Sequence, residues 1–256
     1  MAAANPLPLI LASVAAVTPT IAIVAPRSLA VLLPVAAVAA VIARWRQGRF
    51  ALPSWALITL ITLFLAWAAM TALWTPDVPL AWRAWRGIVG LSVAGLLLLG
   101  LAQRLEEAGR AKVGMALLIG VGIALAIFCV EFASALLLPR SVTAMINGKP
   151  QFSEAVFNRA AVTIVLLLWP AAYVLAQRRG LIAALALLIA AGLVLSRFDS
   201  MAAGLGLLAG AIVWLLASWR PRGTALGLAV VLIVGTALAP VVPRTAFVGT
   251  LAERRD

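Results

Sequence analysis

The sequence predicts an all-α, polytopic integral membrane protein, a helical bundle of about nine transmembrane helices. Its 256 residues are 65% hydrophobic, and only 20 of them are basic and 8 acidic. A membrane-spanning helix needs about 20 mostly apolar residues, so a chain of this length holds about eight or nine spans and little else. This composition excludes a soluble enzyme, a disordered chain and a small disulfide scaffold.

The apolar runs divide the chain into spans, which we predict to form a single transmembrane domain, 1–256. The first run has no Lys or Arg before it, so we interpret it as a membrane anchor rather than a cleavable signal. Only the tripeptide Pro-Arg-Ser separates the first two runs, which form either a tight hairpin or two independent crossings. We expect residues 244–256 to begin a periplasmic loop that is truncated. The predicted spans are about 7–25, 29–43, 51–73, 88–102, 113–138, 160–177, 181–196, 201–218 and 224–243.

Basic residues in the connecting segments predict the orientation of the chain. Ten of them fall on one side of the alternating spans, and eight fall on the other side before the tail. The first group is clustered in short polar loops such as Arg44-Trp-Arg-Gln-Gly-Arg49, which favours the cytoplasm for that side and for the N-terminus. Because the net charge of +12 is spread along the chain rather than gathered in one stripe, we expect anionic lipids and no nucleic acid as partners.

The sequence also limits the chemistry that side chains can perform. It contains no histidine and a single cysteine, Cys129, which lies inside an apolar run where we expect it to be buried. The common zinc sites and the nucleophiles that are paired with histidine are therefore excluded. We predict neither a metal nor a cofactor.

The first predicted outer loop, 74–87, contains closely spaced tryptophans and arginines. Its Pro-Asp-Val-Pro sequence favours a turn followed by a helix start. On that helix Trp82 and Trp85 are nearly in line, and Arg83 and Arg86 are displaced from them by about 100 degrees. The element is either an interfacial anchor with snorkelling arginines or a place where a guanidinium binds a diphosphate.

The second predicted outer loop ends in Phe157-Asn158-Arg159, just before the span at 160–177. A positive charge at a helix N-terminus opposes the helix dipole, so we expect an anion to offset it. Glu154 is one such anion. The other is a ligand phosphate, held jointly by Arg159 and the amide groups of that helix end, with Asn158 in support.

Two further polar positions interrupt the apolar runs. A short break after residue 195 holds Arg197 near the membrane boundary, either to bind a ligand or to pair with Asp199. Glu131 lies inside the fifth predicted span, where a carboxyl group is costly and is a functional candidate. It lies either deep in the span or near its outer third, protonated or paired with an arginine. These residues fit a transporter, a flippase or an enzyme that acts on lipid-linked diphosphates.

Three short motifs resemble the bacterial O-antigen ligase and polymerase superfamily. The order of the motifs and their side of the membrane also agree with that family. The family has a large periplasmic loop and further spans beyond the point where this chain ends. The motifs are Trp74-Thr-Pro-Asp-Val-Pro79, Phe157-Asn158-Arg159 before a span containing Trp169-Pro170, and Leu195-Ser196-Arg197 before a small-residue span.

The resemblance implies a metal-independent, inverting glycosyl transfer at the periplasmic face of the bacterial inner membrane. A glycan carried on undecaprenyl diphosphate would move to lipid A-core, in a ligase, or to another glycan, in a polymerase, during lipopolysaccharide or surface polysaccharide synthesis. Matched residue by residue, Arg197 and then Arg159 bind the diphosphate, with Arg83 and Arg86 as further candidates. Their charges would offset the negative charge that develops on the leaving group.

One departure from the family is serious, because its essential histidine lies in the large loop and this sequence has none. The chain is expected to be an N-terminal fragment or an inactive relative, and the 256 residues alone are predicted not to catalyse transfer. A multi-span transporter or flippase for an anionic or lipid-linked solute is the alternative. A structural subunit whose arginines bind anionic lipid is a third possibility.

Overall fold

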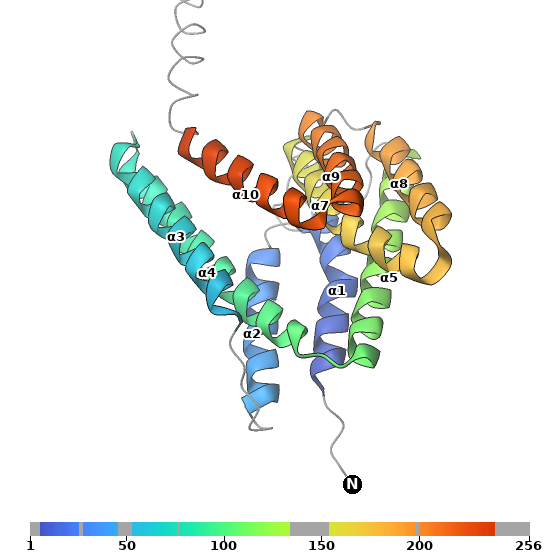
Figure 1. Ribbon diagram of the computed structural model, residues 1–256, viewed down its shortest axis with the longest axis horizontal. Helices are drawn as coiled ribbons and strands as arrows, with labels where there is room; N and C mark the ends of the chain where they lie inside the picture. Colours follow the sequence, from blue (N-terminus) through green and yellow to red (C-terminus); the bar gives the residue numbers. More distant parts are fainter. Residues whose placement is uncertain are drawn as a thin grey trace, which may run out of the picture. The chain divides into compact units, whose positions relative to one another are not determined.

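A computed structural model of the chain consists of helices in the residues that it describes (Figure 1). It describes residues 6–25, 28–45, 53–75, 77–133, 154–197 and 200–238. Within these residues there is no strand, which confirms the all-α prediction. The chain divides into two compact units, Met1–Leu207 and Leu208–Asp256, and the boundary falls inside a helix. The account below concerns the first unit, and the prediction of a single domain stays a prediction.

The described helices lie where apolar runs occur in the sequence. Five of them are long and apolar enough to cross a membrane, namely α1, α4, α5, α7 and α9, and three shorter ones are apolar as well. This supports a membrane protein, while the count of nine spans stays a prediction. The helices are α1 (Leu7–Val24), α2 (Leu29–Trp45), α3 (Trp55–Thr71) followed by the 3-10 turn η2 (Ala72–Trp74), α4 (Val78–Gln103), α5 (Glu107–Ala133), α7 (Glu154–Arg179), α8 (Leu181–Leu195), α9 (Met201–Trp219) and α10 (Pro221–Leu238).

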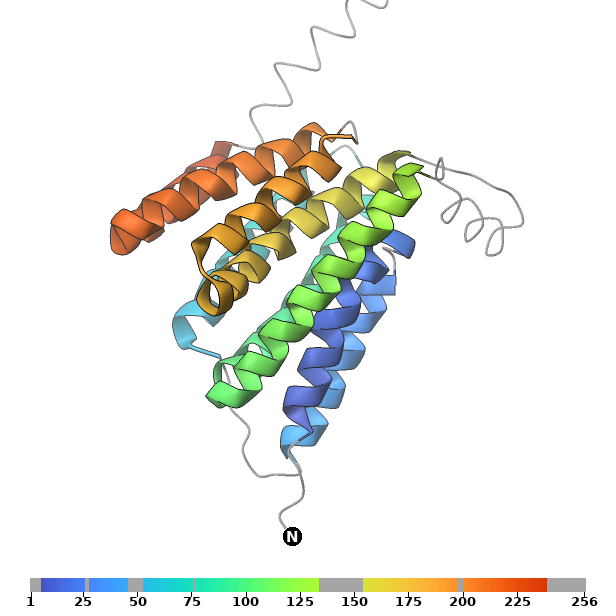
Figure 2. The ribbon, with the colours of Figure 1, turned by 90° about the vertical axis from the view of Figure 1, so that its right-hand side faces the viewer.

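The centre of the first unit is the parallel pair α1 and α5, which Figures 1 and 2 both show side by side. Gly109 lies beside the Pro8 ring and Gly120 beside the backbone of Ala16, so the two helices run in the same direction. A Cβ atom added to Gly120 would lie 2.9 Å from the Ala16 Cα. A glycine is required there because the two backbones approach too closely for any side chain.

Helix α7 packs antiparallel to α5. Near one end of α5, Gly114 lies against Val174, and near the other end Phe128 is buried with Ala160 and Ile164. Burial of these apolar side chains joins α5, α7, α8 and the start of α9 into one core, to which α1 contributes Ile23. The core thereby fixes the ends of four helices next to one another.

Helix α4 is longer than the predicted span at 88–102. The predicted helix start is confirmed, because the Asp77 carboxylate accepts a hydrogen bond from the Leu80 N–H at 2.9 Å and caps the helix. The helix then continues without a break to Gln103, so the predicted outer loop is largely its first turns. The helix is longer than the predicted span because charged side chains end an apolar run without ending the backbone hydrogen bonding of a helix.

The two tryptophans of α4 contact each other, and one of them also contacts α3. The rings of Trp82 and Trp85 meet edge to face, with centroids 5.2 Å apart. The Trp85 Nε1–H donates to the Leu65 carbonyl oxygen of α3 at 2.9 Å. This indole N–H therefore joins α4 to α3.

Candidate functional site

The candidate site lies where the C-terminal ends of α5 and α8 meet the N-terminal ends of α7 and α9. Two pockets open there, and residues of the first unit line both of them. The sequence analysis selected Arg159, Asn158, Arg197 and Glu131 from this end of the helices. These four residues therefore lie at the same end of the packed helices.

The first pocket is polar at one wall and has a volume of about 670 Å³. Helix α7 contributes Asn158, Arg159 and Thr163, and the start of α9 contributes the opposite wall. The Arg159 side chain is exposed, and its backbone carbonyl accepts a hydrogen bond from the Thr163 hydroxyl at 2.9 Å. The pocket is therefore an open hollow with a permanent positive charge at one wall. Its lining is Asn158, Arg159, Val162, Thr163, Ser200, Met201 and Ala202.

The helix end beside Arg159 is that of α9, which corrects the sequence analysis. Helix α7 begins at Glu154, so Arg159 lies in its second turn and not at its N-terminus. The amide groups of that turn are bonded inside the helix, and they cannot hold a phosphate as we expected. The Glu154 side chain, the other expected partner of Arg159, lies outside the described residues.

Ser200 caps the start of α9. Its hydroxyl oxygen accepts a hydrogen bond from the Ala203 N–H at 3.3 Å, and its carbonyl oxygen accepts one from Gly204 at 3.1 Å. The N–H groups of Met201 and Ala202 belong to the first turn, where an α-helix supplies no carbonyl for them. Because both residues line the pocket with Arg159, this helix end adds partial positive charge to it.

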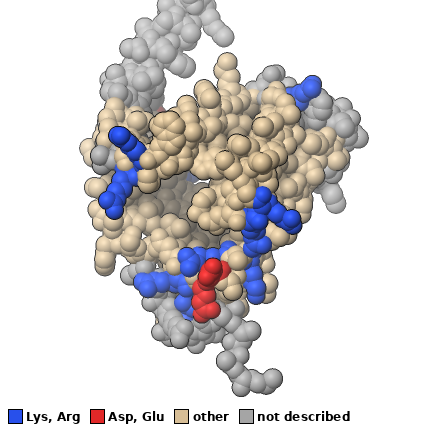
Figure 3. All heavy atoms as spheres, turned by 45° about the vertical axis from the view of Figure 1, so that its right-hand side comes forward, with Lys and Arg blue, Asp and Glu red and all other residues tan. Residues whose placement is uncertain are grey.

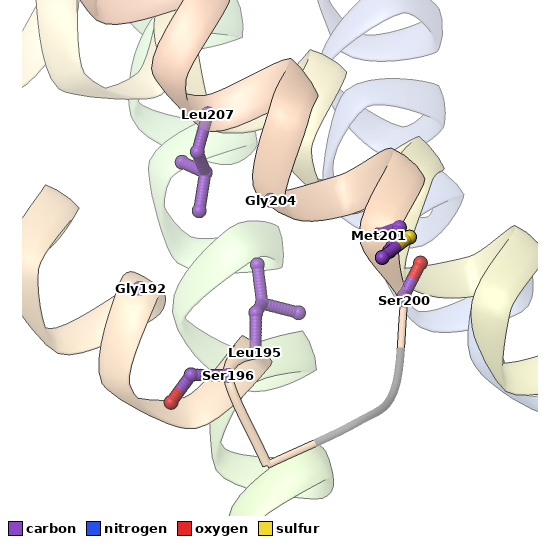
Figure 4. A pocket seen from close by; sticks show the side chains of 7 residues that line it. All are labelled: Gly192, Leu195, Ser196, Ser200, Met201, Gly204 and Leu207. Atoms are coloured by element: carbon purple, nitrogen blue, oxygen red, sulfur yellow. The ribbon is translucent and has the colours of Figure 1, made fainter.

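A second pocket, of about 410 Å³, separates α8 from α9. Figure 4 shows Leu195 and Leu207 projecting into the gap between the two helices, with the hydroxyl-bearing Ser196 and Ser200 nearer to the connection. The two glycines of this lining have empty space where a side chain would begin, since nothing lies within 4 Å of an added Cβ. We call this pocket the apolar slot; its lining is Gly192, Leu195, Ser196, Ser200, Met201, Gly204 and Leu207.

The two pockets are neighbours because Ser200 and Met201 line both. The pocket beside Arg159 thus adjoins the apolar slot, whose lining includes glycines and leucines. The sequence analysis did not select Ser200, Met201, Thr163 or the glycines. A serine directly before an apolar run is a recognisable helix cap and would have indicated Ser200.

Arg197 lies on the turn that follows α8, next to a residue of the apolar slot. Its side chain is exposed, and its backbone N–H bonds to the Val194 carbonyl at 3.3 Å. It is not part of the lining of either pocket. Asp199, its expected partner, lies outside the described residues. The structure thus puts Arg197 at the rim of the slot rather than in its wall.

Arg83 and Arg86 are not brought together with the other candidates. Both are exposed on the first turns of α4, and α4 packs mainly on α2 and α3. Neither arginine lines the two pockets. The structure therefore separates these two arginines from Arg159 within the part of the chain that it describes.

Glu131 is completely buried in the last turn of α5, beside the core residue Phe128. It lies 19 residues beyond Lys112, which corresponds to about 28 Å along a helix. That is close to the thickness of the hydrocarbon layer, about 30 Å, so Glu131 belongs near the end of the helix and not at its middle. The nearby Cys129 is exposed, contrary to expectation, because an apolar run can face lipid as well as protein.

Neither a metal-binding cluster in the described part of the chain nor a similarity to known proteins points to a function. Among the residues that the structure describes, no three His, Cys, Asp or Glu side chains lie together in a way that would hold a metal ion. No family model, curated protein or solved structure matches the chain. The function is therefore argued from the two pockets and the arginines around them.

Proposed function

We propose that the chain is the membrane part of an O-antigen ligase-like glycosyltransferase that binds an undecaprenyl-diphosphate-linked glycan. The joined ends of α5, α7, α8 and α9 form the binding place, which faces the periplasm from the bacterial inner membrane. The acceptor is lipid A-core or another glycan. The motif resemblance supports this choice of family, and the two pockets support this class of ligand.

The observation that carries the proposal is that the two pockets adjoin, because Ser200 and Met201 line both. A ligand that fills both has an anionic end beside Arg159 and an apolar chain between α8 and α9. A polyprenyl diphosphate has this combination of a doubly charged head and a hydrocarbon tail. A small soluble anion would bind beside Arg159 and leave the apolar slot empty.

The chemistry of the polar wall suits a diphosphate leaving group. A guanidinium offers a planar fork of N–H donors that matches two phosphate oxygens at once. The first amide groups of α9 point a partial positive charge at the same hollow. Together they would stabilise the charge that develops on the diphosphate as the glycosidic bond to it breaks. Arg197, at the rim of the slot, adds a second guanidinium on the same side.

The chain supplies binding groups but no general base of the usual kind. It contains no histidine, and histidine is the side chain that most often removes a proton from an attacking hydroxyl at neutral pH. We therefore expect the 256 residues to bind the lipid-linked donor without transferring its glycan. A preparation of this chain alone that transfers glycan to an acceptor would contradict this expectation.

The transporter alternative gains no support from the arrangement of the helices. Such proteins commonly place polar groups near the bilayer midplane on interrupted helices. Here α7 runs through Pro170 without a break, and Glu131 lies in the last turn of α5. We therefore keep the lipid-linked diphosphate as the proposed ligand.

The first experiment measures binding to the purified chain in nanodiscs, with undecaprenyl diphosphate and inorganic diphosphate as the two probes. We expect Arg159→Gln to weaken both probes by about tenfold or more, because a charge-assisted hydrogen bond is lost. Arg159→Lys should retain part of the affinity, since it keeps the charge and loses the fork. Arg83→Gln removes an equally exposed charge outside the pockets and is the matched control.

A second variant tests the tail of the ligand. Gly204→Leu fills the apolar slot and should weaken undecaprenyl diphosphate while leaving inorganic diphosphate unchanged. Gly95→Leu is the control, because Gly95 also has nothing within 4 Å of an added Cβ but lies on α4. Equal affinity of Arg159→Gln and the unchanged protein for both probes would overturn the proposed function.

A further inference from the structure

The opposite end of the α5–α7 pair carries a second arrangement of charge. The Arg178 guanidinium donates from Nη2 to the Ala111 carbonyl oxygen of α5 at 3.1 Å. One turn earlier, Val174 packs on Gly114 with its Cγ2 3.0 Å from the position of an added Cβ. Residues four apart share a helix face, so the packing of Val174 sets Arg178 over α5. One of the five N–H donors of the guanidinium makes the hydrogen bond that holds Arg178 in place.

This end is rich in positive charge. Arg110 and Lys112 on α5 and Arg178 and Arg179 on α7 are all exposed. The face in Figure 3 has its largest gathering of Lys and Arg atoms in the lower half, where the acidic atoms of that face also lie. The acidic residues at the start of α5 are Glu106 and Glu107, so basic groups outnumber acidic ones around the joint of the two helices.

The start of α5 and the end of α7 lie at one membrane boundary if Arg159 lies at the opposite boundary. Arg159 and Arg178 are 19 residues apart on α7, or about 28 Å, which matches the hydrocarbon thickness of about 30 Å. On α5, Lys112 is followed at helical spacing by the exposed apolar residues Met115 and Ile119. A cation at the boundary is thus continuous with an apolar stripe that leads into the bilayer.

We propose that Lys112 and Arg178 form a binding site for the phosphate of an anionic phospholipid, whose acyl chain lies along Met115 and Ile119. Arg110 and Arg179 strengthen the positive field around the phosphate. The same two cations would attract free phosphate, but the apolar stripe favours a ligand with a hydrocarbon chain. This site is independent of the proposed function, because it lies at the other end of the helices.

The test measures lipid bound to the full chain by native mass spectrometry, after reconstitution in vesicles of equal parts phosphatidylglycerol and phosphatidylcholine. We expect phosphatidylglycerol to be retained in preference. Each juxtamembrane cation contributes about fivefold to the attraction of an anionic lipid, so Lys112→Gln with Arg178→Gln should reduce the preference on the order of twentyfold. Lys112→Gln alone keeps the Arg178 hydrogen bond and should reduce it about fivefold.

A matched double variant separates a site from diffuse charge. Arg220→Gln with Arg222→Gln also removes two exposed arginines, at the start of α10, and should reduce the preference much less than the Lys112 and Arg178 double variant does. An equal loss in both double variants would overturn the proposal, because it would mean that only total charge matters. Displacement of the bound lipid by millimolar inorganic phosphate would also overturn it, in favour of a free phosphate site.

Discussion

Glycine has opposite uses at the α1–α5 contact and at the α8–α9 slot. At Gly120 an added Cβ would run into the backbone of Ala16, so this glycine allows two helices to touch. At Gly192 and Gly204 nothing lies within 4 Å of an added Cβ, and the glycines border an open pocket. In the first region the lack of a side chain allows two helices to touch, and in the second it leaves a pocket open.

A small residue in an apolar helix therefore does not by itself indicate close packing against another helix. Close helix contacts in membranes are commonly built on glycine, and the α1–α5 pair follows that rule. In the slot, a hydrophobic ligand has room that a larger side chain would fill. Substitutions that add one methyl group to each glycine in turn test whether the two regions differ in this way.

The largest effect is expected for Gly120→Ala. The methyl group would collide with the Ala16 carbonyl of a neighbouring helix, and neither backbone can move without disturbing a long contact. We expect a loss of about 3 kcal/mol in the free energy of unfolding. Thermal unfolding in detergent micelles measures it. Gly122→Ala, two residues away with nothing within 4 Å, is the control and should not lose stability, since alanine in an open helical position raises the free energy of unfolding by about 0.5 kcal/mol.

Gly100→Ala should have a smaller effect of the same sign. The added Cβ would lie 2.9 Å from the Pro53 nitrogen and Cδ, which belong to the segment before α3 and not to a helix. Because that segment can shift more easily than a packed helix, we expect a loss of about 1 kcal/mol, at the low end for overpacked positions. The same unfolding measurement checks this, and a loss equal to that of Gly120→Ala would contradict the proposed reason.

Much of the helical layout follows from the sequence. Apolar runs locate the helices, and the Pro-Asp-Val-Pro sequence locates the start of α4, since Asp77 is a helix cap. The lengths of α4 and α7 do not follow, because hydropathy measures fitness for the bilayer, and Arg83 or Arg159 can occupy a helix turn without ending it. The runs therefore predict where lipid begins better than where a helix begins.

The candidate site follows only in part. Arg159 could be selected because a charge beside an apolar run requires a reason. The N-terminal end of α9 could not be selected from the sequence. Ser200 is 41 positions away from Arg159, and only the packing of α7 on α9 brings the two residues to one pocket. The slot could not be predicted either, because the same residue type gives contact at Gly120 and space at Gly204.

The smallest effect, and the one of opposite sign, is expected at the slot. Gly204→Ala adds a methyl group to open space and replaces the poorest helix former apart from proline, so the free energy of unfolding should rise by about 0.5 kcal/mol. Gly206→Ala is the matched control on the same helix, because its Cβ would lie 3.2 Å from Val165 Cγ1 and must displace it. We expect the control to be less stable than Gly204→Ala, because Val165 must give way by a few tenths of an ångström. If both variants lose stability equally, the slot is closed by packing, and the contrast between glycine for contact and glycine for space does not hold.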